Sequence, residues 1–188
     1  LILLLCPLFL LIIVALWVEQ FFVSSSRGPI FYFETRVSRG RSFRMPKFRT
    51  VRQSVIKETR QRKSGGIKTI KELEMRGENL TWMGRFLKNY YLDELPQLMQ
   101  ILLGQMSFVG PRPWPEVDYR DQLARGINTK GVIPCGWTGL YQCNKGKPVS
   151  DLQLDLDYIE AYKTKGNLDL LWYDLTILAR SVPMMLEG

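Results

Sequence analysis

Residues 93–104 read DELPQLMQILLG, and this stretch decides how the chain is interpreted. Aspartate favours helix caps, proline is common in the first turn of a helix, and glycine is common just after its end. The stretch therefore predicts a helix with Asp93 near the cap, Pro96 in the first turn and Gly104 as the terminator. A capping carboxylate is the structural interpretation of Asp93, whereas the adjacent Glu94 favours a chemical one.

A proline-rich loop follows this predicted helix. Residues 104–115 read GQMSFVGPRPWP, in which Pro111 and Pro113 fix the φ angle on either side of Arg112. A guanidinium group held in this way suits bidentate contact with a phosphate. The competing interpretation is a proline-rich turn that presents a solvated arginine.

Further cations precede the acidic pair. The stretch KFRT at residues 47–50 supplies two of them, and Arg85 and Lys88 lie one to two helical turns before Asp93. Cations around a carboxylate lower its pKa, so we expect Asp93 to be ionised. The same cations could neutralise a pyrophosphate group.

Composition narrows the chemistry. The chain has 188 residues, which suits one domain, and a formal net charge of +8, which favours phosphates, anionic lipid headgroups or nucleic acid as partners. It has no histidine, which excludes Ser-His and Cys-His nucleophile pairs and histidine metal sites. A nucleophile or proton carrier must therefore be a carboxylate, lysine, cysteine or tyrosine. The three scattered cysteines fit a reducing, cytoplasmic setting.

The N-terminus carries the strongest membrane signal. Residues 1–18, LILLLCPLFLLIIVALWV, contain no charge, which predicts a membrane helix. Pro7 should break or kink this helix, and both a kinked span and a re-entrant hairpin stay open. Residues 27–63 carry twelve Lys/Arg and two Glu, which places this flank in the cytoplasm.

The remaining segments show weaker patterns. Residues 28–50 mix aromatic and β-branched residues with glycine and proline, which predicts short strands, and residues 57–79 read as a polar surface loop with some helix. A helical period begins at Thr81, with an aromatic face that suits either the core or a membrane surface. Residues 168–188 pose the same alternatives.

Six stretches, in order, resemble one family. They are RGPIFYFETRVSRGRSFRMPKFRT (27–50), TWMGRFLKNYYLDELPQL (81–98), GQMSFVGPRP (104–113), GWTGLYQ (136–142), DYIEAY (157–162) and LWYDLTIL (171–178). The chain resembles the catalytic domain of bacterial sugar transferases, the monotopic polyprenyl-phosphate phosphoglycosyl transferases. LDELPQL with MSFVGPRP downstream is the most specific part of this resemblance.

The resemblance implies a fold and a location. We expect an α+β, mostly helical protein in which residues 1–23 form a re-entrant membrane helix. Residues 24–188 would then form a cytoplasmic catalytic domain with a small β element, amphipathic interfacial helices and a surface-lying active site. Such a protein lies at the bacterial inner membrane, with its catalytic domain on the cytoplasmic face.

The resemblance also implies a reaction. A sugar 1-phosphate passes from a UDP-sugar to polyprenyl (undecaprenyl) phosphate, releasing UMP and requiring Mg²⁺, as the first membrane step of glycoconjugate synthesis. Asp93 would be the nucleophile, and Glu94 would assist with the metal or a proton, so these two residues would hold Mg²⁺. Arg112 would hold the nucleotide. The other residues expected to bind substrate are Lys47, Arg49, Arg85, Lys88, Gln97, Pro111 and Pro113.

Other partners and departures complete the expectations. Membrane lipids are expected partners, nucleic acid is not, and a homodimer is left open. Cys6-Pro7 stands where the family has Ser-Pro, Val51 where Met is usual after KFRT, and Cys135 where Pro is typical. The sugar and the glycan pathway are not fixed by these residues. The alternative function is a non-catalytic membrane-anchored module that binds anionic lipid or nucleic acid through its basic segment.

Overall fold

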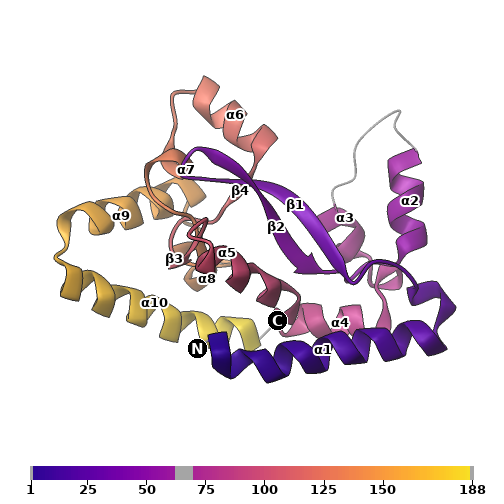
Figure 1. Cartoon of the computed structure of the whole chain (residues 1–188). Coiled ribbons are helices and arrows are strands. Elements are labelled where there is room, and N and C mark those ends of the chain that lie inside the picture. The colour runs from indigo at the N-terminus through magenta and orange to yellow at the C-terminus, as the bar shows by residue number, and fades with distance from the viewer. Residues whose placement is uncertain (1, 62–69, 187–188) are drawn as a thin grey trace. The chain divides into compact units, whose positions relative to one another are not determined.

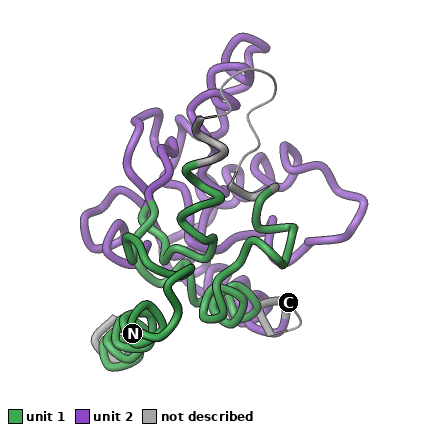
Figure 2. Tube along the Cα trace, turned by 90° about the vertical axis from the view of Figure 1, so that its right-hand side faces the viewer, with its two compact units in different colours: residues 1–32, 46–96 green, residues 33–45, 97–188 purple. Residues whose placement is uncertain are grey.

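The computed structural model describes residues 2–61 and 70–186 (Figure 1). The chain forms two compact units (Figure 2). Unit 1 comprises Leu1–Tyr32 and Pro46–Pro96, and unit 2 comprises Phe33–Met45 and Gln97–Gly188. Residues 62–69, part of the segment predicted to be a polar surface loop, fall outside the described residues.

Unit 1 begins with the predicted apolar helix, α1 (Ile2–Phe22). Within residues 2–61 and 70–186 it is the one helix long and apolar enough to cross a membrane. Trp17 and Phe21 on this helix are 70% and 75% exposed, as a lipid-facing surface would require. The helix is not broken at Pro7, because this proline lies only in the second turn and deprives just the Leu3 carbonyl of its helical partner.

The predicted strands of residues 28–50 are confirmed as a β-hairpin. Its strands are β1 (Phe31–Ser38) and β2 (Arg41–Phe48). Arg39 and Gly40 in the turn have φ angles of 50° and 69°, the left-handed conformation that two-residue hairpin turns require. The hairpin belongs to a three-stranded sheet of order β2-β1-β4.

Most of the hairpin, residues 33–45, belongs to unit 2, and the rest of unit 1 consists of short helices around a small core. The described elements are η1 (Ser24–Ser26), α2 (Gln53–Gln61), α3 (Ile70–Met75), η2 (Gly77–Asn79), α4 (Trp82–Asn89) and η3 (Leu92–Gln97). One buried cluster joins Val51, Ile56, Leu73 and Leu80. The last residue of η3, Gln97, is the residue at which unit 2 resumes.

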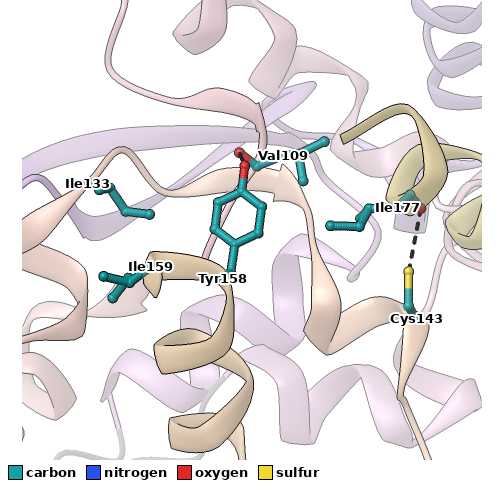
Figure 3. Packing of buried hydrophobic residues seen from close by; sticks show 6 residues of the cluster. All are labelled: Val109, Ile133, Cys143, Tyr158, Ile159 and Ile177. Carbon is teal, nitrogen blue, oxygen red and sulfur yellow. Dashed lines mark hydrogen bonds between the residues drawn. The ribbon is translucent and has the colours of Figure 1, made fainter. Parts of the chain in front are cut away.

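Unit 2 packs two longer helices against a pair of parallel strands. Its described elements are α5 (Leu98–Leu102), β3 (Ser107–Val109), β4 (Trp114–Pro115), α6 (Glu116–Ala124), α7 (Thr129–Val132), β5 (Gly136–Thr138), α8 (Leu140–Cys143), α9 (Asp151–Thr164) and α10 (Asn167–Leu186). Figure 3 shows the core cluster of this unit, in which Tyr158 points between the strand and helix side chains. Its hydroxyl donates to the Val109 carbonyl at 3.2 Å. The mostly helical α+β class is therefore confirmed.

Two helices combine a buried face with an exposed apolar face. Leu87 on α4 is fully buried, while Trp82 on the opposite face is 74% exposed. Ile177 on α10 packs in the unit 2 core, while Leu168 and Trp172 are exposed. Each helix thus has the buried stripe of a core helix and also the exposed apolar side chains of the membrane-surface alternative.

Candidate active site

Helix α4 leads into the acidic pair, and its start is fixed by backbone contacts. The Thr81 side chain caps the helix by accepting from the Gly84 amide at 2.9 Å, at the residue where the sequence predicted a helical period to begin. The Thr81 amide in turn donates to the Thr50 carbonyl at 2.8 Å. A Cβ atom on Gly84 would lie 2.1 Å from that same carbonyl oxygen, so only glycine allows this approach.

A second cap on α4 comes from the apolar N-terminal helix. Glu19 is 7% exposed, and its carboxylate accepts from the amides of Trp82 at 2.8 Å and Met83 at 3.3 Å. The Ser26 hydroxyl donates to the same oxygen at 3.0 Å. A carboxylate at a helix N-terminus binds unpaired amides and complements the helix dipole. This explains how an acid near the end of α1 is buried.

The acidic pair lies in a 3-10 helix rather than at the cap of an α-helix. Tyr91, with a φ angle of 54°, makes the turn out of α4, and Asp93 and Glu94 follow in the first turn of η3. The predicted cap position of Asp93 is therefore wrong, because a 3-10 turn, common at the start of α-helices, takes up these residues. Gly104 is confirmed as the terminator, since it follows α5 with a φ angle of 69°.

Two other carboxylates, Glu94 and Glu74, act on Asp93 within unit 1, and each of them pairs with a lysine. Asp93 is 6% exposed. The Lys47 ammonium lies 2.9 Å from a Glu94 oxygen. Glu74, whose charge also acts on Asp93, accepts from the Thr50 hydroxyl at 2.7 Å and lies 3.5 Å from the Lys88 ammonium. Sequence reasoning missed Glu74, which lies in a polar segment with no motif to mark it.

Burial raises the pKa of Asp93 to about 7, and the charge of Glu94 adds to this rise. Glu74 acts in the same direction, whereas Lys47 lowers the pKa. The expectation that surrounding cations lower this pKa is therefore wrong. Desolvation and two like charges outweigh one lysine, so both protonation states of Asp93 are populated near neutral pH.

The cations predicted to bind phosphate differ in their surroundings. Arg49 is buried, and its guanidinium donates to the carbonyls of Pro29 and Val51 at 2.7 Å and of Ser26 at 2.6 Å. This occupation by backbone carbonyls argues against a phosphate contact at Arg49, whereas the phosphate role expected of Lys47 stays a prediction.

Two further cations lie on α4. Arg85 is exposed, and its Nε donates to the Gly77 carbonyl at 3.2 Å. Lys88 is half-buried and pairs with Glu74. Both stay as predicted phosphate ligands, since a solvated or paired cation at the surface can exchange its partner for a phosphate.

The other predicted substrate ligands belong to unit 2. Gln97 is 2% exposed, and its amide nitrogen has no hydrogen-bond partner among the described residues. The Arg112 guanidinium lies over the Tyr141 ring, 5.1 Å from its centroid, and Pro111 and Pro113 on either side are buried. The stiff presentation of Arg112 expected from the two prolines is thus accompanied by an aromatic support that the sequence did not indicate.

Asp93 and Glu94 are the residues with the chemistry to hold a magnesium ion. Their oxygens are the hard ligands that Mg²⁺ takes, and Mg²⁺ often binds one or two carboxylates together with substrate phosphates. Among the described residues no group of three or more His, Cys, Asp or Glu side chains forms a metal cluster. The excess negative charge that raises the pKa of Asp93 fits a cation at this place.

A long apolar helix and a buried carboxylate with a raised pKa beside a second carboxylate are typical of a membrane-associated enzyme. The family described as "Bacterial sugar transferase" matches residues 1–188. The chain therefore belongs to the bacterial sugar transferase family.

Several curated relatives are similar over nearly the whole chain. The UDP-galactose-lipid carrier transferase of Erwinia amylovora is 30% identical over 94% of the chain and 37% of its own length. The undecaprenyl-phosphate galactose phosphotransferase of Salmonella typhimurium is 31% identical over 97% of the chain and 39% of its own length. A UDP-glucose:undecaprenyl-phosphate glucose-1-phosphate transferase of Caulobacter vibrioides is 31% identical over 96% of the chain and 63% of its own length. The chain thus spans less than two thirds of each of these relatives.

Proposed function

We propose that this protein transfers a sugar 1-phosphate from a UDP-sugar to undecaprenyl phosphate, giving polyprenyl-diphosphate-sugar and UMP. The reaction would be the first membrane step of bacterial glycoconjugate synthesis. The names of relatives support the two substrates, and they differ in the sugar, which is glucose, galactose or N-acetylgalactosamine. The observation that carries the proposal is the buried Asp93, whose pKa is raised to about 7 beside Glu94.

Asp93 acts as the nucleophile in this proposal. One carboxylate oxygen attacks the phosphorus that bears the sugar, and the bond from that phosphorus to the UMP oxygen breaks, with UMP leaving with the electron pair. An oxygen of the polyprenyl phosphate then attacks the same phosphorus and releases the Asp93 carboxylate. A pKa of about 7 suits this role, because a substantial fraction of the carboxylate is ionised at neutral pH and its basicity favours bond formation.

The neighbouring groups have supporting roles. Lys47 holds Glu94 by its ion pair and lowers the pKa of Asp93, so it increases the ionised fraction of the nucleophile. Mg²⁺, when bound by Asp93 and Glu94, supplies charge neutralisation for the phosphates. Arg85 and Lys88 are proposed to bind phosphate oxygens, while Arg112 is proposed to hold the nucleotide with Gln97.

The membrane arrangement is proposed from the apolar surfaces. The exposed apolar side chains of α1 and α4 in unit 1, and separately those of α10 in unit 2, suit contact with lipid at the level of the headgroups. We propose that α1 is re-entrant and that the catalytic part faces the cytoplasm. Accessibility labelling in vesicles tests this, using cysteines placed at the two flanks of α1 after Cys6→Ser. Labelling from opposite sides would exclude re-entry.

Trapping the covalent intermediate tests the reaction. The protein is incubated with a panel of UDP-sugars without polyprenyl phosphate, and intact-mass and peptide mass spectrometry are used to locate a phosphosugar adduct. We expect about one UMP released per protein and an adduct on Asp93. Asp93→Asn should give neither, while the matched control Asp118→Asn, which changes an exposed carboxylate on α6, should behave as the parent. No adduct and no UMP with any sugar would refute the proposal and favour a non-catalytic module.

A further inference from the structure

The loop that presents Arg112 is anchored at both ends within unit 2. On its N-terminal side, the Gly110 amide donates to the Thr138 carbonyl at 3.0 Å, and the Pro111 carbonyl accepts from the Gly136 amide at 2.9 Å. The second bond lies outside the register of β3 and β5, in which Gly136 faces Ser107, so the chain after β3 folds back toward the start of β5. The first half of the loop is therefore held by two backbone hydrogen bonds to β5.

The C-terminal anchor of the loop is much shorter. Strand β4 consists of Trp114 and Pro115 only, and pairs with β1 through Val37 and Arg36. A two-residue strand that contains a proline makes few ladder hydrogen bonds, so pairing alone holds it weakly. Arg112 lies two residues before Trp114, the first residue of β4, so a further restraint on this strand is needed if Arg112 is to keep one orientation.

Lys130 supplies such a restraint. Its ammonium lies 4.6 Å from the centroid of the Trp114 ring, while its side chain is only 1% exposed. Asp155 on α9 accepts from this ammonium and, at 2.8 Å, from the Thr129 hydroxyl. These bonds and its burial hold the Lys130 ammonium in one place. Its cation–π contact therefore also restrains the Trp114 ring.

The same segment is tied to the hairpin. The Lys130 carbonyl accepts from the Gly40 amide at 3.1 Å, and the Cys135 amide donates to the Ser38 hydroxyl at 3.0 Å. In Figure 1, α7 and β4 lie beside the turn end of the β1-β2 hairpin, in agreement with these bonds. The ion pair, the hairpin and β4 thus form one connected block.

A buried ion pair often adds little to the free energy of unfolding compared with apolar side chains in the same place. Two apolar side chains of similar volume would often serve as well, because removing both charges from water is expensive. An apolar residue at position 130, however, would give Trp114 no cation to hold its ring in one place. The pair therefore has a use in orientation that an apolar replacement would lack.

We propose that the Lys130–Asp155 pair is a positioning device for the Pro111–Arg112–Pro113 loop, acting through the Trp114 ring. Lys130 and Asp155 do not touch the nucleotide; they fix the segment from which Arg112 reaches it. The inference rests on the proposed function in one respect, namely that Arg112 binds the uridine nucleotide of the donor.

A double-mutant cycle tests this coupling. The first variant, Lys130→Met with Asp155→Leu, removes both charges and keeps apolar volume, and Lys163→Met is a matched control on the exposed face of α9. Affinity for UMP is measured by calorimetry on the full chain in nanodiscs, with and without Arg112→Ala. We expect the paired variant to weaken UMP binding roughly fivefold or more when Arg112 is present, and not to weaken it further when Arg112 is absent. The control should leave UMP affinity unchanged.

A purely structural role gives a different result. Equal loss of UMP affinity in both backgrounds, or no loss in either, would overturn the inference while leaving the proposed function intact. If the paired variant does not give a cooperative melting curve, Trp114→Leu replaces it, because this variant leaves the ion pair in place and removes only the ring.

Hydrogen exchange supplies a readout that needs no nucleotide. We expect the amides of Arg112 and Trp114 to exchange several-fold faster in the paired variant, while the Tyr158 amide in α9 keeps its parent rate. If the parent protein does not bind UMP, the assignment of Arg112 to the nucleotide fails, and the exchange rates alone decide the positioning role. Unchanged exchange at both loop amides would then overturn it.

Discussion

Asp93 in unit 1 and Asp155 in unit 2 are both nearly inaccessible to solvent, at 6% and 4% exposure, yet their surroundings differ. Asp155 is bonded to a lysine and a hydroxyl, whereas Asp93 has Glu94 and Glu74 as electrostatic neighbours. Burial raises the pKa of both groups. Lys130 and Thr129 oppose this at Asp155, while at Asp93 the neighbouring carboxylates reinforce it.

The two aspartates illustrate two reasons for burying a carboxylate: one serves the fold and the other serves the chemistry of the site. A compensated carboxylate holds other groups in place, and its removal should damage the fold. A carboxylate buried among like charges reduces stability at neutral pH, so its presence needs a reason other than folding. Five experiments test this contrast.

The largest expected effect is on turnover. Asp93→Asn should lower the rate of UMP release by at least ~10⁴-fold, more than about 5 kcal/mol in the barrier, because no oxygen nucleophile remains at that place. UMP formation from a UDP-sugar and undecaprenyl phosphate is the measurement. A variant that retains a tenth of the parent rate would remove Asp93 from the mechanism.

Removing the compensated aspartate should mainly affect folding. Asp155→Ala leaves the Lys130 ammonium buried and unpaired, so the free energy of unfolding should fall by about 3–5 kcal/mol. Denaturant unfolding measures this, with Asp118→Ala on the surface of α6 as the control. If Asp155→Ala unfolds at the parent midpoint, the contrast between the two aspartates is wrong.

The pH dependence of stability should have an unusual sign at Asp93. Its pKa is raised from 3.8 to about 7, so as pH rises across this interval the unfolded chain releases a proton that the folded chain retains. The parent should therefore lose stability relative to Asp93→Asn between about pH 4 and pH 7, with no further change above pH 8. At ~1.4 kcal/mol per pKa unit the difference is at most ~4 kcal/mol. Thermal melts of both proteins at matched pH values show whether the difference between their melting temperatures widens from about pH 4 to pH 7.

Lys47 offers a way to sharpen the comparison. Lys47→Met removes the cation that lowers the pKa of Asp93, so the midpoint of the pH–rate profile for adduct formation should move above about 7. At pH 7 the rate should fall roughly tenfold, because an opposite charge nearby is worth one or more pKa units. Lys57→Met, an exposed lysine of α2, is the control. An unshifted midpoint would mean that another group sets the profile.

The smallest expected effect concerns the Glu19 cap. Glu19→Gln keeps an acceptor for the α4 amides but loses the charge, which should lower the free energy of unfolding by about 0.5–1 kcal/mol. Glu19→Ala should cost about 1–2 kcal/mol. Exposed Glu78→Gln serves for comparison. Equal unfolding midpoints for all three variants would show that the cap is replaced by water.

Local signals predicted the local structure. The short strands over residues 31–48, the helix that begins near Thr81 and the terminator at Gly104 each follow from residues within a few positions of one another. Such signals act through backbone geometry and nearby hydrogen bonds. They are therefore readable from a single sequence.

The electrostatics of the site could not be predicted in this way. The pKa of Asp93 depends on burial and on Glu74, which comes from a segment with no recognisable pattern. Lys47 and Arg49 would share a face if the strand continued, but β2 ends at Phe48, and Arg49 turns into the core instead. The Glu19 cap joins residues more than sixty positions apart, a contact that only tertiary structure reveals.

Gly84 has a consequence for how this protein tolerates change. Because the backbone of α4 meets the Thr50 carbonyl with no side chain between them, no choice of rotamer elsewhere can make room for alanine, whose Cβ would stand 2.1 Å from that oxygen. The position of α4, which leads to Asp93, therefore depends on the absence of a Cβ atom at residue 84. In a saturation library, position 84 should accept only glycine. Position 82, two residues earlier, should accept other residue types, because the Trp82 side chain is exposed.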